Sequence, residues 1–209
     1  MSRDRARTEE KILKAVGDIL AEPGGSRRVG VNAIAERAGV DKVLIYRYFG
    51  GGDGLLAAFA EKSDLWPTVE DAARERAIPE GDLASALTAL VQGYLAALRR
   101  RPAALETIAW DVGEKTALSA GLDTFREQWR RDATTRVFRH HKVPARVDIE
   151  AVMAVLAAAA DHLAARGRLG GGFYGVALDD DVGRKRIDEA IAVILKGVLN
   201  YAHVGKAED

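Results

Sequence analysis

The stretch IAERAGVDKVLIYRYF, residues 34–49, has the pattern of two short helices joined by a tight turn. Gly39 can take the left-handed conformation that ends a helix, and Asp41 can cap the next helix by accepting a hydrogen bond from a free backbone N–H. In that second helix Ile45 and Phe49 fall four residues apart on the inner face. The outer face carries Lys42, Val43, Tyr46 and Arg47. Because one face packs and the other is free, the stretch predicts a helix-turn-helix that reads DNA.

The same residues resemble the signature of TetR-type bacterial transcriptional regulators, in which Gly-Val-polar precedes an Ile-Tyr-x-Tyr-Phe run and a Leu pair. The matching positions are Gly39, Val40, Asp41, Ile45, Tyr46, Tyr48, Phe49, Leu55 and Leu56. The resemblance is specific over residues 8–62, and beyond them it rests on size and the all-helical pattern. Three positions depart from the family pattern. Gly52 replaces a lysine that often touches phosphate, Leu44 replaces a small or hydroxylated residue, and Gly30 replaces a threonine.

Composition favours a globular, soluble, cytoplasmic protein. Of 209 residues, 48% are hydrophobic, and no apolar run reaches the roughly 18 residues of a membrane span. The start, MSRDRAR, lacks a signal peptide's apolar stretch, and without cysteine there is neither a disulfide nor a thiolate metal site. Residues 1–50 hold 10 Lys and Arg against 7 Asp and Glu, although the net charge is zero. This surplus fits a basic DNA-reading domain on an acidic body, or ordinary scatter.

Helical periodicity without lasting strand-like alternation predicts an all-α fold. The resemblance divides it into a helix-turn-helix domain, residues 1–53, and a larger ligand-binding and dimerisation domain, residues 54–209, with the fourth helix as connector. The helices outside the quoted stretch are expected at about 8–22, 54–64, 82–101, 102–112, 120–141, 149–165 and 184–203. Asp53 is expected to cap the fourth helix, Pro67 and Pro79 to mark breaks, and Arg27 and Arg28 to lie in a loop.

The last two helices predict a homodimer. Residues 149–165 are apolar almost all round, and residues 184–203 carry a broad apolar stripe, so a second subunit is the simplest cover. The resemblance implies the same four-helix interface, and a two-fold dimer would set two DNA-reading domains about 34–36 Å apart. The predicted interface residues are Val152, Leu156, Ile191, Ile194 and Val198. The long glycine-rich segment between them, residues 167–181, is expected to be a mobile cover beside this interface. It lacks the preceding strand and the following Gly-Lys-Ser/Thr of a phosphate-binding loop.

The candidate DNA-binding residues are Asn32, Lys42, Val43, Leu44, Tyr46, Arg47 and Tyr48. Lys42 and Arg47 can bond guanine or phosphate, and Val43 and Leu44 can touch thymine methyl groups. Phosphate contacts by Asn32 and by both tyrosines are implied by the resemblance. Arg3, Arg5 and Arg7 are expected to follow the DNA backbone as a flexible arm. For each residue the alternative is a solvated side chain, and Leu44 can simply pack inside.

A small-molecule effector is implied by the TetR-like body. The candidate ligand-binding residues are Trp66, Tyr94, Trp110, Phe125, Trp129 and His162, with Asp111 and Gln128 as further polar groups. Pockets are mainly apolar with a few placed polar groups. The alternative is that these aromatic residues form ordinary core.

No catalytic pattern is present. The sequence has neither His-Glu-x-x-His nor Gly-x-Ser-x-Gly, so we expect no enzyme activity and no cofactor, while a metal site across a dimer stays open. The resulting prediction is a repressor that occupies a double-stranded, palindromic operator and is released by a ligand. An activator or ligand-independent regulator with the same DNA-reading domain is the first alternative. An all-α small-molecule-binding protein or enzyme without DNA binding is the second.

Overall fold

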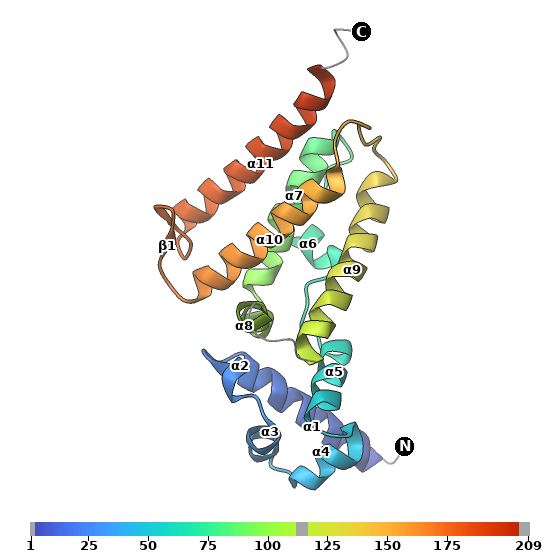
Figure 1. Cartoon of the computed structure of the whole chain (residues 1–209), viewed down its shortest axis with the longest axis vertical. Helices are drawn as coiled ribbons and strands as arrows, with labels where there is room; N and C mark the ends of the chain where they lie inside the picture. The colour runs from blue at the N-terminus through green and yellow to red at the C-terminus, as the bar shows by residue number, and fades with distance from the viewer. Residues whose placement is uncertain (1–2, 112–116, 205–209) are drawn as a thin grey trace. The chain divides into compact units, whose positions relative to one another are not determined.

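The structure is a computed structural model that describes residues 3–111 and 117–204. Within these ranges the chain forms α-helices and one short hairpin, which confirms the all-α prediction (Figure 1). The helices are α1 Arg3–Leu20, α2 Gly25–Arg28, α3 Val31–Ala38, α4 Lys42–Phe49, α5 Gly52–Lys62, α6 Val69–Glu75, α7 Leu83–Arg99, α8 Pro102–Asp111, α9 Ala117–Phe138, α10 Ile149–Arg168 and α11 Asp181–Val204.

The chain divides into two compact units. The first unit contains the residues up to Trp66 together with Arg101–Glu127, and the second contains Pro67–Arg100 together with the residues from Gln128 onward. Because Arg101–Glu127 returns to the first unit, that unit is made of two separate stretches of chain. The long helix α9 contributes to both units.

In the first unit, α1 packs against α3, α5 and α8 (Figure 1). Its buried residues Ile12, Val16 and Leu20 form a core with side chains of the other helices, including Ile34 and Leu55. Burial of this apolar stripe holds α1 in place, since each large aliphatic side chain contributes about 1.5–3 kcal/mol when removed from water.

The start of α1 corrects the prediction of a flexible arm. The helix begins at Arg3, so Arg3, Arg5 and Arg7 lie within it rather than in an extended segment. Two local contacts extend the helix towards the N-terminus. The Thr8 hydroxyl donates to the Asp4 carbonyl oxygen at 2.8 Å, and Arg5 pairs with Glu9 at 2.7 Å.

Two short helices were not predicted. Arg27 and Arg28 belong to α2 rather than to a loop, and α6 fills the stretch between the two proline breaks. The sequence does contain the start signal of α6. The Thr68 hydroxyl accepts from the Asp71 backbone N–H, and the Asp71 carboxylate accepts from the Thr68 backbone N–H, which is a capping box.

In the second unit, α7 packs against α6, α10 and α11 (Figure 1). The contact with α6 requires glycine, because a Cβ atom built on Gly93 would lie 2.2 Å from the Ala72 carbonyl oxygen. On its other side the buried Tyr94 hydroxyl of α7 donates to the Asp161 carboxylate of α10 at 2.6 Å. A buried carboxylate needs such donors to remain stable in the core.

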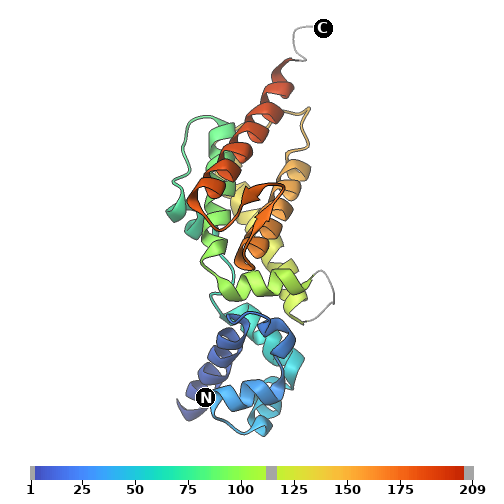
Figure 2. The same cartoon turned by 90° about the vertical axis from the view of Figure 1, so that its left-hand side faces the viewer.

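The glycine-rich segment 167–181 contains a small antiparallel hairpin instead of a continuous loop. Strand β1, Gly172–Phe173, pairs with β2, Val176–Ala177, and the two strands contact α10 and α11 respectively (Figure 2). The turn residues Tyr174 and Gly175 have φ values of 50° and 74°, as a tight two-residue hairpin turn requires. None of the helices in the described residues is long and apolar enough to span a membrane.

Candidate nucleic-acid interface

The turn between α3 and α4 has the predicted geometry. Gly39 has a φ of 64°, and its N–H donates to the Glu36 carbonyl oxygen at 3.1 Å. The next N–H, from Val40, donates to the Ala35 carbonyl oxygen at 3.0 Å. These bonds satisfy carbonyl groups at the end of α3 and form the tight turn that leads into α4.

Helix α4 then begins at a side-chain cap. The Asp41 carboxylate accepts from the Val43 backbone N–H at 2.8 Å. Ile45 is fully buried, so the inner face of α4 is held by the core of the first unit. Both the cap and the buried residue were predicted from the sequence.

The opposite face of α4 is open to solvent. Val43 is 59% exposed and Tyr46 is 57% exposed, so both side chains are available to a partner. Lys42 and Arg47 are also exposed, and among the described residues neither forms an ion pair. Asn32 is exposed on α3, whereas Leu44 and Tyr48 are half-buried. The exposed face thus combines two cations without an ion pair in the described residues, a phenol that can form hydrogen bonds, and an apolar side chain.

Tyr48 is flanked by two guanidinium groups. The Arg5 guanidinium carbon lies 4.9 Å from the centre of the Tyr48 ring, and that of Arg47 lies 5.7 Å from it. Such cation–π contacts fix the ring and both charges in one region. Sequence reasoning assigned Arg5 to a flexible arm and missed its contact with Tyr48, because this contact requires α1 to begin before Arg5.

The connection from α4 to α5 consists of glycines with constrained roles. Gly50 has a φ of 77° and Gly51 a φ of 125°, and Gly51 is the N-terminal cap residue of α5. Asp53 lies inside the first turn of α5, and no side chain caps this helix, so the predicted cap by Asp53 is wrong. A Cβ atom on Gly52 would lie 3.4 Å from Val31, an ordinary contact that leaves room for a side chain there.

Two basic residues near the turn, Arg28 and Arg37, form ion pairs with Glu22. Glu22 accepts from Arg28 at 2.7 Å and from Arg37 at 2.8 Å, which links the end of α1 to α2 and α3. The hydrogen bond from Arg28, followed by that from Arg37, lowers the pKa of Glu22 below its usual value. Since their charges are compensated, Arg28 and Arg37 are weaker candidates for phosphate contact than Lys42 and Arg47.

The aromatic ligand candidates form pairs within each unit. In the first unit Trp66 stacks on Phe125, with ring centres 5.1 Å apart and planes inclined by 17°. In the second unit Tyr94 contacts Trp129, with ring centres 4.9 Å apart. The indole N–H groups of Trp66 and Trp129 are buried without an acceptor in the described part of the chain.

The other ligand candidates are more exposed. Trp110 is half-buried on α8, and His162 is exposed on α10 with its ring edge-on to Phe173 at 5.1 Å. Gln128 is exposed and donates to Asp132 at 2.8 Å, while the side chain of Asp111 lies outside the described residues. Among the described residues no three acidic or histidine side chains gather as a metal site would require.

The five predicted dimer residues differ in exposure. Leu156 and Ile191 are buried within the single chain, at 5% and 7% exposure, whereas Ile194 is 47% exposed. Val152 and Val198 are half-buried. The outer faces of α10 and α11 also expose large apolar side chains that were not singled out from the sequence, namely Val155, Val182 and Val193.

The fold and the exposed face of α4 define a helix-turn-helix protein of the DNA-binding class. Residues 18–59 match the model of a family described as bacterial regulatory proteins, tetR family. The chain therefore carries the N-terminal DNA-binding domain of the TetR family, as the resemblance in the sequence indicated.

Solved structures agree at the level of the fold. The chain is similar to a tetR-family transcriptional regulator from Streptomyces coelicolor, with 17% identity, a TM-score of 0.63, and coverage of 98% of this chain and 84% of that one. It is also similar to a protein from Rhodococcus sp. assigned to the TetR-family transcriptional regulators, with 24% identity, a TM-score of 0.60, and coverage of 91% and 99%. No curated protein matches the chain significantly.

Proposed function

We propose that the chain is a transcriptional repressor that binds a palindromic operator as a homodimer and is released by a small molecule. The observation that carries the proposal is the exposed face of α4, where Lys42 and Arg47 have no ion pair in the described part of the chain and lie beside the exposed Val43 and Tyr46. Basic and apolar side chains on one helix suit the guanine acceptors and thymine methyl groups of the major groove. The proposal also places the protein in the cytoplasm and assigns it no enzymatic activity.

In this proposal the two parts of the sequence have different functions. Residues 1–53 read DNA, and residues 54–209 bind the ligand and dimerise, with α5 as connector. Val155 on α10 and Val193 and Ile194 on α11 are large apolar side chains that the single chain leaves exposed. They support dimerisation, because a partner subunit would remove them from water. Each unit has one buried indole N–H without an acceptor in the described part of the chain, that of Trp66 in the first and that of Trp129 in the second. Either one supports ligand binding, since a ligand oxygen could accept its hydrogen bond.

The release mechanism is a shift between two populations. A ligand that binds better when the two DNA-reading domains are misplaced lowers operator affinity by the same factor by which DNA lowers ligand affinity. Two alternatives have distinct signatures. An activator would bind upstream of the promoter rather than across it, and a carrier or enzyme would bind no specific DNA.

The direct test is selection of DNA by the full-length protein. Genomic fragments from the source organism are incubated with the protein, and the retained fragments are sequenced. We expect enrichment of an inverted repeat whose half-sites lie about one helical turn apart. A Lys42→Ala/Arg47→Ala double variant serves as control and should lose the enrichment. If the wild-type protein enriches no sequence, the proposal is wrong.

A further inference from the structure

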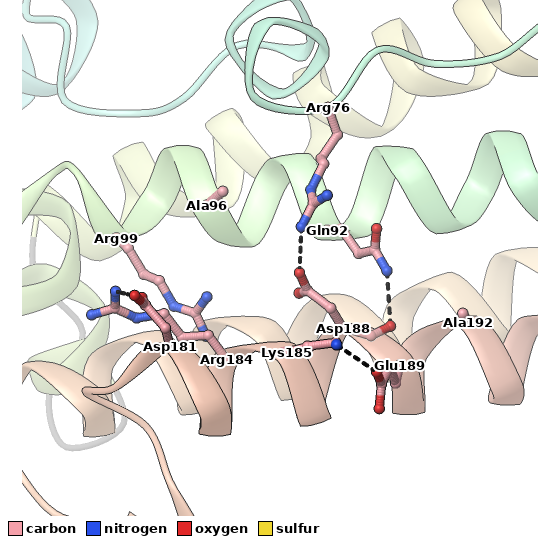
Figure 3. Close-up of a pocket in the computed structure, with 10 residues that line it drawn as sticks. All are labelled: Arg76, Gln92, Ala96, Arg99, Asp181, Arg184, Lys185, Asp188, Glu189 and Ala192. Carbon is pink, nitrogen blue, oxygen red and sulfur yellow. Dashed lines mark hydrogen bonds and ion pairs between the residues drawn. The ribbon is translucent and has the colours of Figure 1, made fainter.

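A polar groove runs between α7 and the first half of α11 in the second unit (Figure 3). Its volume is about 500 Å³, within the range of small-molecule sites. Arg76 follows α6, Gln92 and Arg99 come from α7, and Arg184, Lys185 and Asp188 come from α11. None of these residues belongs to the aromatic pairs or to the DNA-reading face, so the groove is a separate feature.

Three of the four cations in the groove have carboxylate partners. Arg76 pairs with Asp188 at 2.6 Å, and Arg184 pairs with Asp181 at 3.1 Å. Lys185 lies 3.9 Å from Glu189. All three carboxylates that line the groove are therefore engaged, and the groove retains one positive charge in excess.

The remaining cation is Arg99. It forms no ion pair within the described part of the chain, and its Nη2 atom is buried without a hydrogen-bond acceptor. In Figure 3 its side chain extends from α7 towards Arg184 on α11. Burial lowers the pKa of the Arg99 guanidinium, nearby Asp188 opposes this change, and the like charge of Arg184 adds to it.

Arg99 and Arg184 are like charges near each other, and the buried Nη2 atom of Arg99 has no hydrogen-bond acceptor in the described part of the chain. A bound oxyanion would stabilise this arrangement. A buried charged donor without an acceptor is costly, and the planar guanidinium fork matches carboxylate and phosphate oxygens. An oxyanion would supply the missing acceptor and would screen the repulsion between Arg99 and Arg184.

We propose that the groove binds a small oxyanion, a phosphate or a carboxylate, between Arg99 and Arg184. A bound anion would bridge α7 and α11, since Arg99 belongs to the first helix and Arg184 to the second. This site is additional to the effector site of the proposed function, and it does not depend on DNA binding.

The test is calorimetric titration of the full-length protein at constant ionic strength. Inorganic phosphate and succinate are used as two probes, which distinguish a phosphate site from a carboxylate site. We expect one of them to bind with millimolar or better affinity and to raise the melting temperature by mass action. Arg99→Gln and Arg184→Gln should each weaken that binding about tenfold or more, because each removes a charge-assisted hydrogen bond.

Two further variants make the result specific. Arg74→Gln removes an equal charge from an exposed residue that pairs with Asp71 outside the groove, and it should leave anion affinity unchanged. Arg99→Lys keeps the charge but loses the planar fork, and it should bind with intermediate affinity. The proposal is overturned if neither probe binds the wild-type protein, or if a folded Arg99→Gln variant binds both probes as tightly as the wild type.

Discussion

Lys42→Ala and Arg47→Ala should each weaken operator binding while leaving the fold intact. A good contact of a basic side chain with guanine contributes about 1–3 kcal/mol of discrimination. Because the proposed dimer carries two copies of α4, each substitution removes two contacts, or about 2–6 kcal/mol, equivalent to roughly 30-fold to 10⁴-fold in affinity.

The cost to stability should be much smaller. Lys42 is exposed and has no ion pair in the described residues, and Arg47 contributes only a cation–π contact at 5.7 Å from the Tyr48 ring. An exposed contact of this kind is worth about 0.5–1 kcal/mol, and the higher helix propensity of alanine offsets part of the loss. We therefore expect nearly unchanged melting temperatures.

The assay is fluorescence anisotropy on the selected operator and on a scrambled duplex, with Arg74→Ala as a charge-matched control. Loss of affinity on the operator alone identifies base contacts. Equal loss on both duplexes would assign the residue to phosphate. Wild-type operator affinity in both variants would refute the placement of the recognition helix.

Three further predictions concern charge, capping and assembly. Gly52→Lys should add one phosphate contact per subunit and steepen the slope of log affinity against log salt by about 1.8 for the dimer, and an unchanged slope would show that position 52 faces away from DNA. Asp82→Ala should lower stability by about 1 kcal/mol at neutral pH, because Asp82 caps α7 through the Ser85 N–H. The hydrogen bond from the Ser85 side chain lowers the pKa of Asp82, so this contribution is present above the ordinary aspartate pKa and lost as pH falls through the lowered value. Acid titrations of unfolding free energy should therefore show the two proteins converging at low pH. Ile194→Glu should convert the proposed dimer to monomers or aggregates in light scattering, and a monomeric wild-type protein at micromolar concentration would remove the basis for a palindromic operator.

The helix-turn-helix was predictable because its determinants are local. Gly39 and Asp41 act through hydrogen bonds to backbone groups within a few residues of themselves, and the inward position of Ile45 follows from the helical period. The long amphipathic helices α7, α10 and α11 were also predictable from their periodicity, within a few residues at each end. By contrast, α2 has only four residues and no apolar periodicity, and its position depends on packing against α1 and α8.

The contacts that sequence reasoning missed join distant residues. The salt bridge from Arg76 to Asp188 spans 112 positions, and the pair formed by Arg5 and Tyr48 requires both α1 and α4 to be in place. No spacing rule within one helix predicts such pairs. The groove around Arg99 could not be predicted for the same reason. Its charged residues come from α7 and the residue after α6, which precede α10 in the sequence, and from α11, which follows it.

The broad apolar stripe of α11 contains both residues buried in the chain's own core and residues exposed on its surface. Ile191 is buried against the chain's own core, whereas Ile194, three residues later, is half exposed on the outer face. A glutamate at position 191 would place a charge in the monomer core and should therefore lower the melting temperature strongly. A glutamate at position 194 would face solvent in the monomer. It should lower stability only in the dimer, where the partner subunit would bury its charge. If Ile194→Glu lowers the melting temperature as much as Ile191→Glu in samples diluted until the wild type is monomeric, then Ile194 belongs to the core of the chain and not to an interface.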